Sequence, residues 1–359
     1  MEIQKAGDNS QQYQISNVTV YQGIDEKRAR EIYNEQYLIA KREFTEEAEQ
    51  IAYKRVAELE SRFMCKINSL PNGLLAFADP SFQFLLIDTQ KVAASTDREV
   101  DYDMLAELLV RRVEKKDDRR IKAGIRGAIG IVGDITDEAL LGLTMVNAMT
   151  SFISTSPDCS TALDTLDEFY GKLIYADLPK NKRWIEELDI LNAIRITAGK
   201  FNSLREYFSI VLNGIIVAGI KKDSEEYHNA LKILSDNELD IPNILVDNCL
   251  LPGYVRINIE SHNALNSRSI INSFVSVKLS EEQKNAIQSV FKLYSKKIEI
   301  QEEIKDKFML EFNKRPNLLL LKDWFENIST FFRITPIGEV LAYTNAKRCC
   351  SDLPPMREY

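Results

Sequence analysis

The side chains best suited to metal binding or nucleophilic catalysis are few in this sequence and widely spaced. Its 359 residues include two histidines and five cysteines. These residues are His228, His262, Cys65, Cys159, Cys249, Cys349 and Cys350. No Cys-x-x-Cys or His-x-x-x-His pair occurs, and neither histidine has a nucleophile and an orienting group beside it in the sequence. We therefore expect no catalytic residue, no metal site and no bound cofactor.

Two other kinds of chemistry are suggested by short motifs. Glycines recur at every third residue from Gly124 to Gly133, but the string Gly-x-x-x-x-Gly-Lys-Ser/Thr of a phosphate-binding loop is absent. We expect these glycines to let one helix approach another closely. Glu114 and Lys116 form the Glu-x-Lys of PD-(D/E)xK nucleases, with Asp101 and Asp103 upstream. The pair lies in a helical pattern, where residues two apart do not share a face, so the motif predicts no nuclease.

One stretch of the chain is rich in positive charge. Its basic residues are Arg111, Arg112, Lys115, Lys116, Arg119, Arg120, Lys122 and Arg126. Such a stretch is typical of phosphate contacts, and nucleic-acid binding is therefore one alternative function. Against it, Glu114, Asp117 and Asp118 interrupt the run, no aromatic side chain is interleaved to stack on bases, and the chain carries a net charge of −8.

The cysteines and the apolar stretches indicate a compartment. The cysteines form no disulfide framework, and the chain does not open with a charged segment followed by an apolar one, so we expect a protein of the reducing cytoplasm. The most apolar stretch, Tyr207–Ile220, holds 14 residues, whereas a bilayer span needs about 18 or more. It predicts a buried helix, and membrane perturbation after a conformational change is a second alternative function.

Composition and periodicity favour helices. Hydrophobic residues make up 45% of the chain, with 14 glycines and 10 prolines, below average usage of these two helix breakers. Asp25, Thr45, Asp79 and Thr136 are typical helix N-caps. Further helices are expected at 161–175, 182–198 and 203–220. We predict a mainly α protein, either a multi-helix bundle or an irregular helical array.

The first 22 residues differ from the rest. Polar turn formers precede a short β segment in which Tyr13 and Ile15 share one face and, after a slip in phase, Val18 and Val20 share another. Two such short strands cannot form a stable core alone, and unpaired strand edges are templates for association between chains. We expect this segment to join copies of the chain into a homo-oligomer, or else to be disordered or to pair within its own chain.

These patterns divide the chain into five parts. They are a β oligomerisation segment (1–22), a helical hairpin (23–70), a helical core domain (71–240), a C-terminal α+β module (241–348) and a tail (349–359). Within the module, Ile334 to Leu341 resembles the strand and last helix of winged-helix domains. The preceding helix, Leu318 to Ile328, carries only Lys322 as a basic residue, so the resemblance implies protein contact rather than DNA reading.

The chain also resembles a family of uncharacterised bacterial proteins. The resemblance lies in Gly7-Asp8-Asn9-Ser10 with the β segment after it, in Ala78-Asp79-Pro80-Ser81-Phe82, and in Ile334-Thr335-Pro336-Ile337-Gly338. It covers both ends and the first third of the chain. It implies a cytoplasmic bacterial protein associated with mobile elements and phage defence, and it implies no catalytic residue.

We therefore expect a non-enzymatic cytoplasmic interaction protein that forms homo-oligomers through its N-terminal β segment. Its expected partners are copies of itself and another protein. A nucleic-acid-binding effector and a membrane-perturbing effector are the alternatives.

Overall fold

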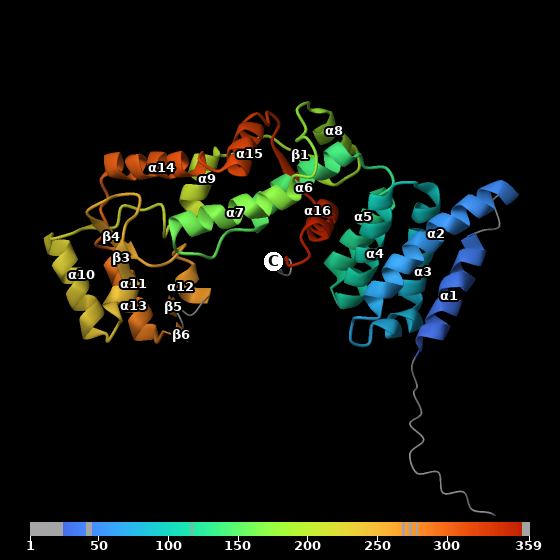
Figure 1. Cartoon of the computed structure of the whole chain (residues 1–359), viewed down its shortest axis with the longest axis horizontal. Coiled ribbons are helices and arrows are strands. Elements are labelled where there is room, and N and C mark those ends of the chain that lie inside the picture. Colours follow the sequence, from blue (N-terminus) through green and yellow to red (C-terminus); the bar gives the residue numbers. More distant parts are fainter. Residues whose placement is uncertain are drawn as a thin grey trace, which may run out of the picture.

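Helices make up most of the protein, and they are arranged as an elongated arch (Figure 1). The computed structural model describes residues 24–40, 45–115, 118–267, 270–272, 275–277 and 279–353. The segment expected to join copies of the chain, with Tyr13, Ile15, Val18 and Val20, lies outside the described residues. The mainly α fold class predicted from the sequence is confirmed.

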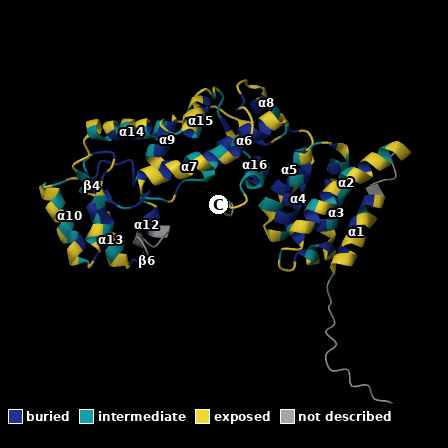
Figure 2. Ribbon diagram, viewed as in Figure 1, coloured by how far each residue is buried: buried dark blue, intermediate teal, exposed yellow. Residues whose placement is uncertain are grey.

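Five α-helices form one end of the arch (Figure 1). They are α1 (Glu26–Ala40), α2 (Glu46–Ile67), α3 (Pro80–Ser95), α4 (Glu99–Glu114) and α5 (Arg119–Ile131), with a 3₁₀ helix, η2 (Gly73–Ala78), before α3. Asp25 caps α1 by accepting the backbone N–H of Arg28 at 2.8 Å, and Asp79 caps α3 by accepting that of Ser81 at 2.9 Å. Buried and exposed residues alternate along α2 (Figure 2), as its periodicity predicts.

The centre of the arch is built around α6 (Asp137–Ser151) and α16 (Pro336–Cys349), which contact each other. Residues 139–149 of α6 are all buried, as expected for a helix that is apolar on every side. α16 also contacts α4 and α5. A Cβ atom at Gly124 of α5 would lie 2.8 Å from the carbonyl oxygen of Pro336, so the glycine stripe does let two helices approach closely.

The prediction of a helix at 182–198 was wrong for the second half of that range. α8 (Arg183–Ile190) ends just before Asn192, whose φ of 60° is left-handed, and β1 (Ile194–Ile196) follows. β1 pairs antiparallel with β7 (Phe332–Ile334), with Ile194 opposite Ile334. The β-branched residues there pair with a strand nearly 140 positions away, a partner that local periodicity does not reveal.

The prediction of a helix at 203–220 was also wrong for the second half of that range. α9 (Leu204–Val211) stops early, and turns lead to β2 (Ile220–Lys221). A Cβ at Gly214 would lie 2.4 Å from the carbonyl oxygen of Ile259, so this backbone packs directly on another segment instead of continuing the helix. Among the described residues, no helix combines the length and apolar character that crossing a membrane would need.

A second, smaller hydrophobic core collects residues from 217 to 294. The elements in this span of the chain are β2, α10 (Glu225–Asp236), α11 (Ile241–Ile244), β3 (Leu245–Asp247), β4 (Tyr254–Ile257), α12 (Ala264–Ser267), β5 (Ile270–Asn272), β6 (Val275–Val277) and α13 (Glu281–Phe291). Three of the strands form an antiparallel sheet in the order β2-β4-β3, and β5 pairs with β6. A capping box formed by Ser280 and Gln283 begins α13.

The chain then returns to the first core through α14 (Ile298–Phe312) and α15 (Pro316–Glu326), which lie along the top of the arch and contact the earlier helix α7 (Cys159–Leu173) (Figure 1). The residues of the expected C-terminal module, 241–348, are therefore divided between the two cores. The strand before the last helix, β7, pairs with β1 rather than with a neighbouring hairpin.

Candidate functional site

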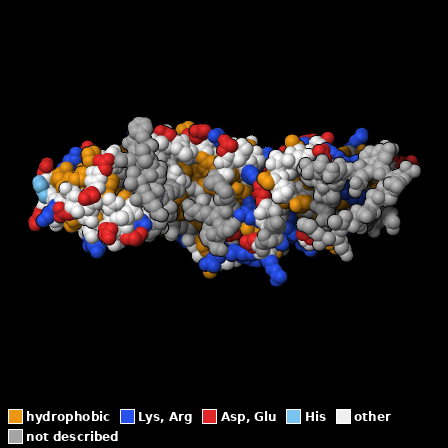
Figure 3. Space-filling view, turned by 90° about the horizontal axis from the view of Figure 1, so that it is seen from below, with side chains coloured by type: hydrophobic (Ala, Val, Ile, Leu, Met, Phe, Trp, Pro, Cys, Tyr) orange, Lys and Arg blue, Asp and Glu red, His pale blue; other side chains and the backbone are white. Residues whose placement is uncertain are grey.

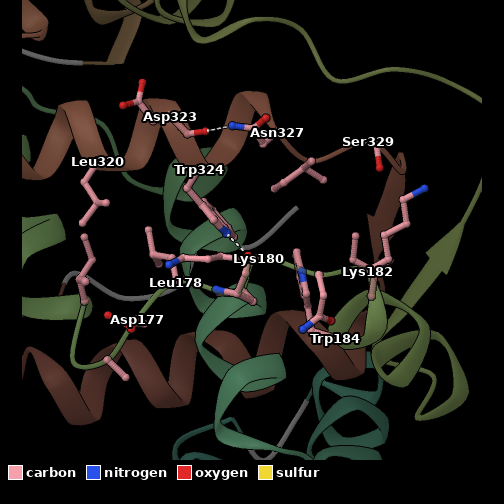
Figure 4. A pocket seen from close by; sticks show the side chains of 16 residues that line it. Asp177, Leu178, Lys180, Lys182, Trp184, Leu320, Asp323, Trp324, Asn327 and Ser329 are labelled. Carbon is pink, nitrogen blue, oxygen red and sulfur yellow. Dashed lines mark hydrogen bonds between the residues drawn. The ribbon is translucent and has the colours of Figure 1, made fainter.

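A cavity of about 650 Å³ opens between α15 and the segment that joins α7 to α8 (Figure 4). Its volume lies in the range of small-molecule and cofactor pockets, about 300–1,000 Å³. It is lined by Ile174, Ala176, Asp177, Leu178, Pro179, Lys180, Asn181, Lys182, Trp184, Ile185, Leu320, Asp323, Trp324, Asn327, Ile328 and Ser329. Most of these residues are apolar. The charged residues among them, Asp177, Lys180, Lys182 and Asp323, are exposed.

Two tryptophans form one wall of this cavity, which we call the tryptophan pocket. The ring centroids of Trp184 and Trp324 lie 6.0 Å apart, and the planes are tilted by 31°. The indole Nε1 of Trp324 donates a hydrogen bond of 2.8 Å to the carbonyl oxygen of Pro179 (Figure 4). Both side chains are buried, so their contacts hold the rings in fixed positions.

The elements around the pocket position these rings. A Cβ at Gly142 of α6 would lie 2.7 Å from Cε3 of Trp184, so the absence of a side chain there lets the indole lie directly on α6. Trp184 also meets the ring of Phe332 edge-on, with centroids 5.8 Å apart. The start of α15 is held by Asp167 of α7, whose Oδ1 accepts the backbone N–H of Leu318 at 3.1 Å. A carboxylate there satisfies an otherwise unpaired helix donor.

The mouth of the pocket is partly apolar and partly charged. Leu320 is 48% exposed although it lines the cavity. Lys180 and Lys182 are exposed and form no ion pair with another described residue, whereas Asp323 lies 3.8 Å from Lys322. A flat apolar group would therefore be in contact with the tryptophans, and an anionic end would meet uncompensated lysines.

A second, polar cluster lies between α4 and α16 around a cavity of about 50 Å³. The Glu107 carboxylate accepts hydrogen bonds from Lys66 at 3.0 Å and pairs with Lys347 at 2.6 Å. Burial acts to raise the pKa of Glu107, but the two lysines outweigh it and hold the pKa below its ordinary value. The Arg111 guanidinium lies 4.4 Å from the Tyr343 ring centroid. The cluster is a satisfied ion network and leaves little room for a ligand.

The structure separates the basic residues expected to meet nucleic acid. Arg111 and Arg112 are buried, and Arg112 donates to Ser81 at 2.9 Å. Of the other six, Lys115 and Lys122 are half-buried, Arg119, Arg120 and Arg126 are exposed, and Lys116 lies outside the described residues. Basic and acidic side chains are interspersed over most of the face in Figure 3.

The residues of the nuclease-like motif do not meet. Asp101 and Glu114 lie near opposite ends of α4, roughly 20 Å apart at the rise of an α-helix. Asp101 is buried and pairs with Arg98 at 2.8 Å. Among the described residues, no three His, Cys, Asp or Glu side chains are grouped as metal ligands would be.

The tryptophan pocket was missed by the sequence analysis. Trp184 and Trp324 are separated by 140 positions, and the segment between α7 and α8 has no periodicity of its own. The one signal for the pocket in the sequence is compositional: the chain has two tryptophans, and both line the pocket.

Comparison with known proteins gives a family. A family model described as ":-like" matches residues 23–354. No curated protein and no solved structure gives a significant match. The matched residues include every element that forms the tryptophan pocket, and the description names no activity.

Proposed function

The chain belongs to the family whose model spans residues 23–354, and on that premise we propose that it is a non-enzymatic binding protein. Its helical body takes up a flat apolar ligand with an anionic end in the tryptophan pocket. The N-terminal β segment joins copies of the chain, so that one assembly carries several such pockets.

The observation that carries this proposal is the pocket itself. Leu320 offers an apolar surface inside a cavity of about 650 Å³, and the two indoles, 2% and 8% exposed, form the wall behind it. An apolar group that leaves water for such a surface gains about 25 cal/mol for each Å² buried. Lys180 and Lys182 supply positive charge at the mouth with no anion of the described chain to neutralise it.

The charge distribution favours binding over catalysis. No histidine or cysteine lines the pocket, and its carboxylates, Asp177 and Asp323, are exposed. The pKa of a general acid or base is commonly shifted by burial or by a close charged partner. An exposed carboxylate lacks the shift that burial would give.

The chain offers a direct readout of this pocket. Its two tryptophans both line the cavity, so indole fluorescence reports on this site alone. We use anilinonaphthalene sulfonate as the probe, because it joins a flat apolar body to an anionic group. Titration of the full-length protein is expected to quench the indoles and to give probe emission by energy transfer from them.

Two neighbouring leucines of α15 provide a matched pair of variants. Leu320 lines the pocket and is 48% exposed, whereas Leu319 is 37% exposed and does not line it. Leu320→Asp is expected to weaken probe binding about tenfold or more, because a carboxylate replaces apolar contact and repels the sulfonate. Leu319→Asp is expected to leave binding unchanged. Equal weakening by both variants, or no energy transfer in the unmodified protein, would contradict the proposal.

A further inference from the structure

Two arginines lie directly opposite each other in the β1–β7 strand pair. The register pairs Arg195 with Arg333, and both side chains are exposed. The N–H of Thr197 donates to the carbonyl oxygen of Phe331 at 3.2 Å. Because hydrogen-bonded pairs alternate along an antiparallel ladder, Arg195 and Arg333 are also such a pair, with Cα atoms about 5.5 Å apart. Their side chains therefore leave the strands on the same face.

The chain does not neutralise these two charges. Like charges directly opposite each other destabilise a strand pair, yet neither Arg195 nor Arg333 forms an ion pair with another described residue. Asp189 of α8 lies beside β1, but its Oδ1 accepts the backbone N–H of Ile196 at 3.1 Å and it pairs with neither arginine. The repulsion is therefore left for an anion from outside the described chain to relieve.

One guanidinium is held in position. Arg195 donates to the carbonyl oxygen of Ile194 at 3.0 Å and to Oδ1 of Asn192 at 2.7 Å. Asn192 is itself fixed, because its carbonyl oxygen accepts the hydroxyl of Thr335 at 2.7 Å. The remaining N–H groups of Arg195, and the whole guanidinium of Arg333, have no hydrogen-bond partner among the described residues. One arginine is thus preorganised, and the other is able to turn toward a ligand.

A lysine adds positive charge at the end of the same strand pair. Lys200 is exposed and forms no ion pair with another described residue. The preceding Gly199 has a φ of 152°, and a Cβ there would lie 2.6 Å from the ring of Phe331. The ring of Phe201 meets that of Phe331 with centroids 4.8 Å apart. These two contacts hold the loop that carries Lys200 against the segment entering β7.

The number of donors favours phosphate over carboxylate. A carboxylate has two oxygens, and a single guanidinium can bind both of them. The phosphate of a monoester carries a charge of about −1.5 to −2 at pH 7 and three acceptor oxygens, so it can meet two guanidinium groups at once. Two arginines on one face match that larger charge and that greater number of acceptors.

This face is separate from the tryptophan pocket. Phe332, between the two faces in sequence, points the other way and meets the ring of Trp184 with centroids 5.8 Å apart. We propose that Arg195 and Arg333 bind the phosphate group of a phosphate monoester, and that Lys200 adds to the attraction. The ligand relieves the repulsion between the two arginines, so binding also stabilises the β1–β7 pair.

The test uses the full-length protein and isothermal titration calorimetry at constant ionic strength, with inorganic phosphate as the probe. Phosphate is expected to bind about tenfold or more tightly than acetate, because acetate can satisfy only one guanidinium. Flotation with phosphatidylcholine vesicles, with and without phosphatidic acid, distinguishes a lipid headgroup from a soluble ester. Binding of phosphate in solution indicates a soluble ester, and binding only of vesicles with phosphatidic acid indicates the lipid. Binding of neither, or equal binding of phosphate and acetate, would overturn the proposal.

Variants separate ligand binding from folding. Arg333→Gln is expected to weaken phosphate binding about tenfold or more. Arg126→Gln removes the same charge from an exposed position on α5 and is expected to leave binding unchanged. Arg333→Glu is expected to abolish binding and yet to raise the urea midpoint of unfolding, because opposite charges then lie across the strands. Equal weakening in Arg333→Gln and Arg126→Gln, or a lower midpoint in Arg333→Glu, would refute the assignment.

Discussion

At the scale of single residues, protonation of the His262 side chain is expected to destabilise the folded state. Its ring stacks on Phe291, with centroids 4.2 Å apart, and its buried Nε2 has no hydrogen-bond partner among the described residues. Burial lowers the pKa of His262 below its ordinary value of 6.5. A proton on this ring would place a charge against an apolar surface.

The first prediction concerns the pH dependence of stability. Because the folded-state pKa of His262 is lowered, its contribution to the free energy of unfolding is complete above pH 6.5 and declines as the pH falls toward that lowered value. His262→Gln removes this titration. Urea unfolding measured above and below pH 6.5 is expected to show a smaller loss of stability in the variant than in the unmodified protein.

The other histidine supplies the control for that experiment. His228 lies on α10 and is exposed, so His228→Gln is expected to leave the pH dependence as it is in the unmodified protein. An unchanged slope in His262→Gln, or an equal change in both variants, would refute the assignment to His262.

At the scale of elements, the contact of α5 with α16 depends on individual glycines. A Cβ at Gly124 would lie 2.8 Å from the backbone oxygen of Pro336, whereas a Cβ at Gly130 of the same helix would meet nothing within 4 Å. The helix thus carries one glycine that is needed for close approach and one that is not.

The second prediction compares alanine at these two positions. Gly124→Ala is expected to lower the free energy of unfolding by about 1–3 kcal/mol, because backbone must move to admit the methyl group. Gly130→Ala is expected to raise it by about 0.4–1 kcal/mol, because alanine restricts the unfolded chain and favours helix. Chemical denaturation of both variants measures the difference. The same sign of change in both would show that the helices do not meet at Gly124.

Elements defined by local signals were predicted well from the sequence. α1, α3 and α6 begin at the caps expected for them, because a cap and the first turn it stabilises lie within a few residues. The errors fall where a remote segment decides the conformation. β1 exists because β7 pairs with it, and α9 stops where Gly214 meets Ile259.

The candidate site could not be predicted for the same reason. Trp324 is recognisable from the sequence as an apolar residue of a helix, but Trp184 is 140 positions away, and only the tertiary fold brings the two rings together. Arg111 and Arg112 show the reverse error. They read as surface charges in the sequence, yet α4 buries both of them. Burial of a charge depends on tertiary partners such as Ser81.

At the scale of the whole molecule, assembly of several copies stays a prediction that rests on residues 1–22. The third prediction is that light scattering gives a mass of more than one chain for the full-length protein and that deletion of residues 1–22 moves it toward the monomer, because the strand edges that join copies are removed. Replacing Tyr13, Ile15, Val18 and Val20 with serine is expected to have the same effect. An unchanged mass after deletion would eliminate this mode of association.

The contact of α16 with α6 joins two segments that are far apart in the chain. The hydrogen bond from Asn345 to Thr144 joins positions 201 residues apart. The second core draws its residues from 217–294, all inside that interval. Closing a long chain is slow, whereas nearby segments meet quickly. Refolding is therefore expected to show a fast phase, in which the second core forms, and a slow phase, in which α16 packs against α6.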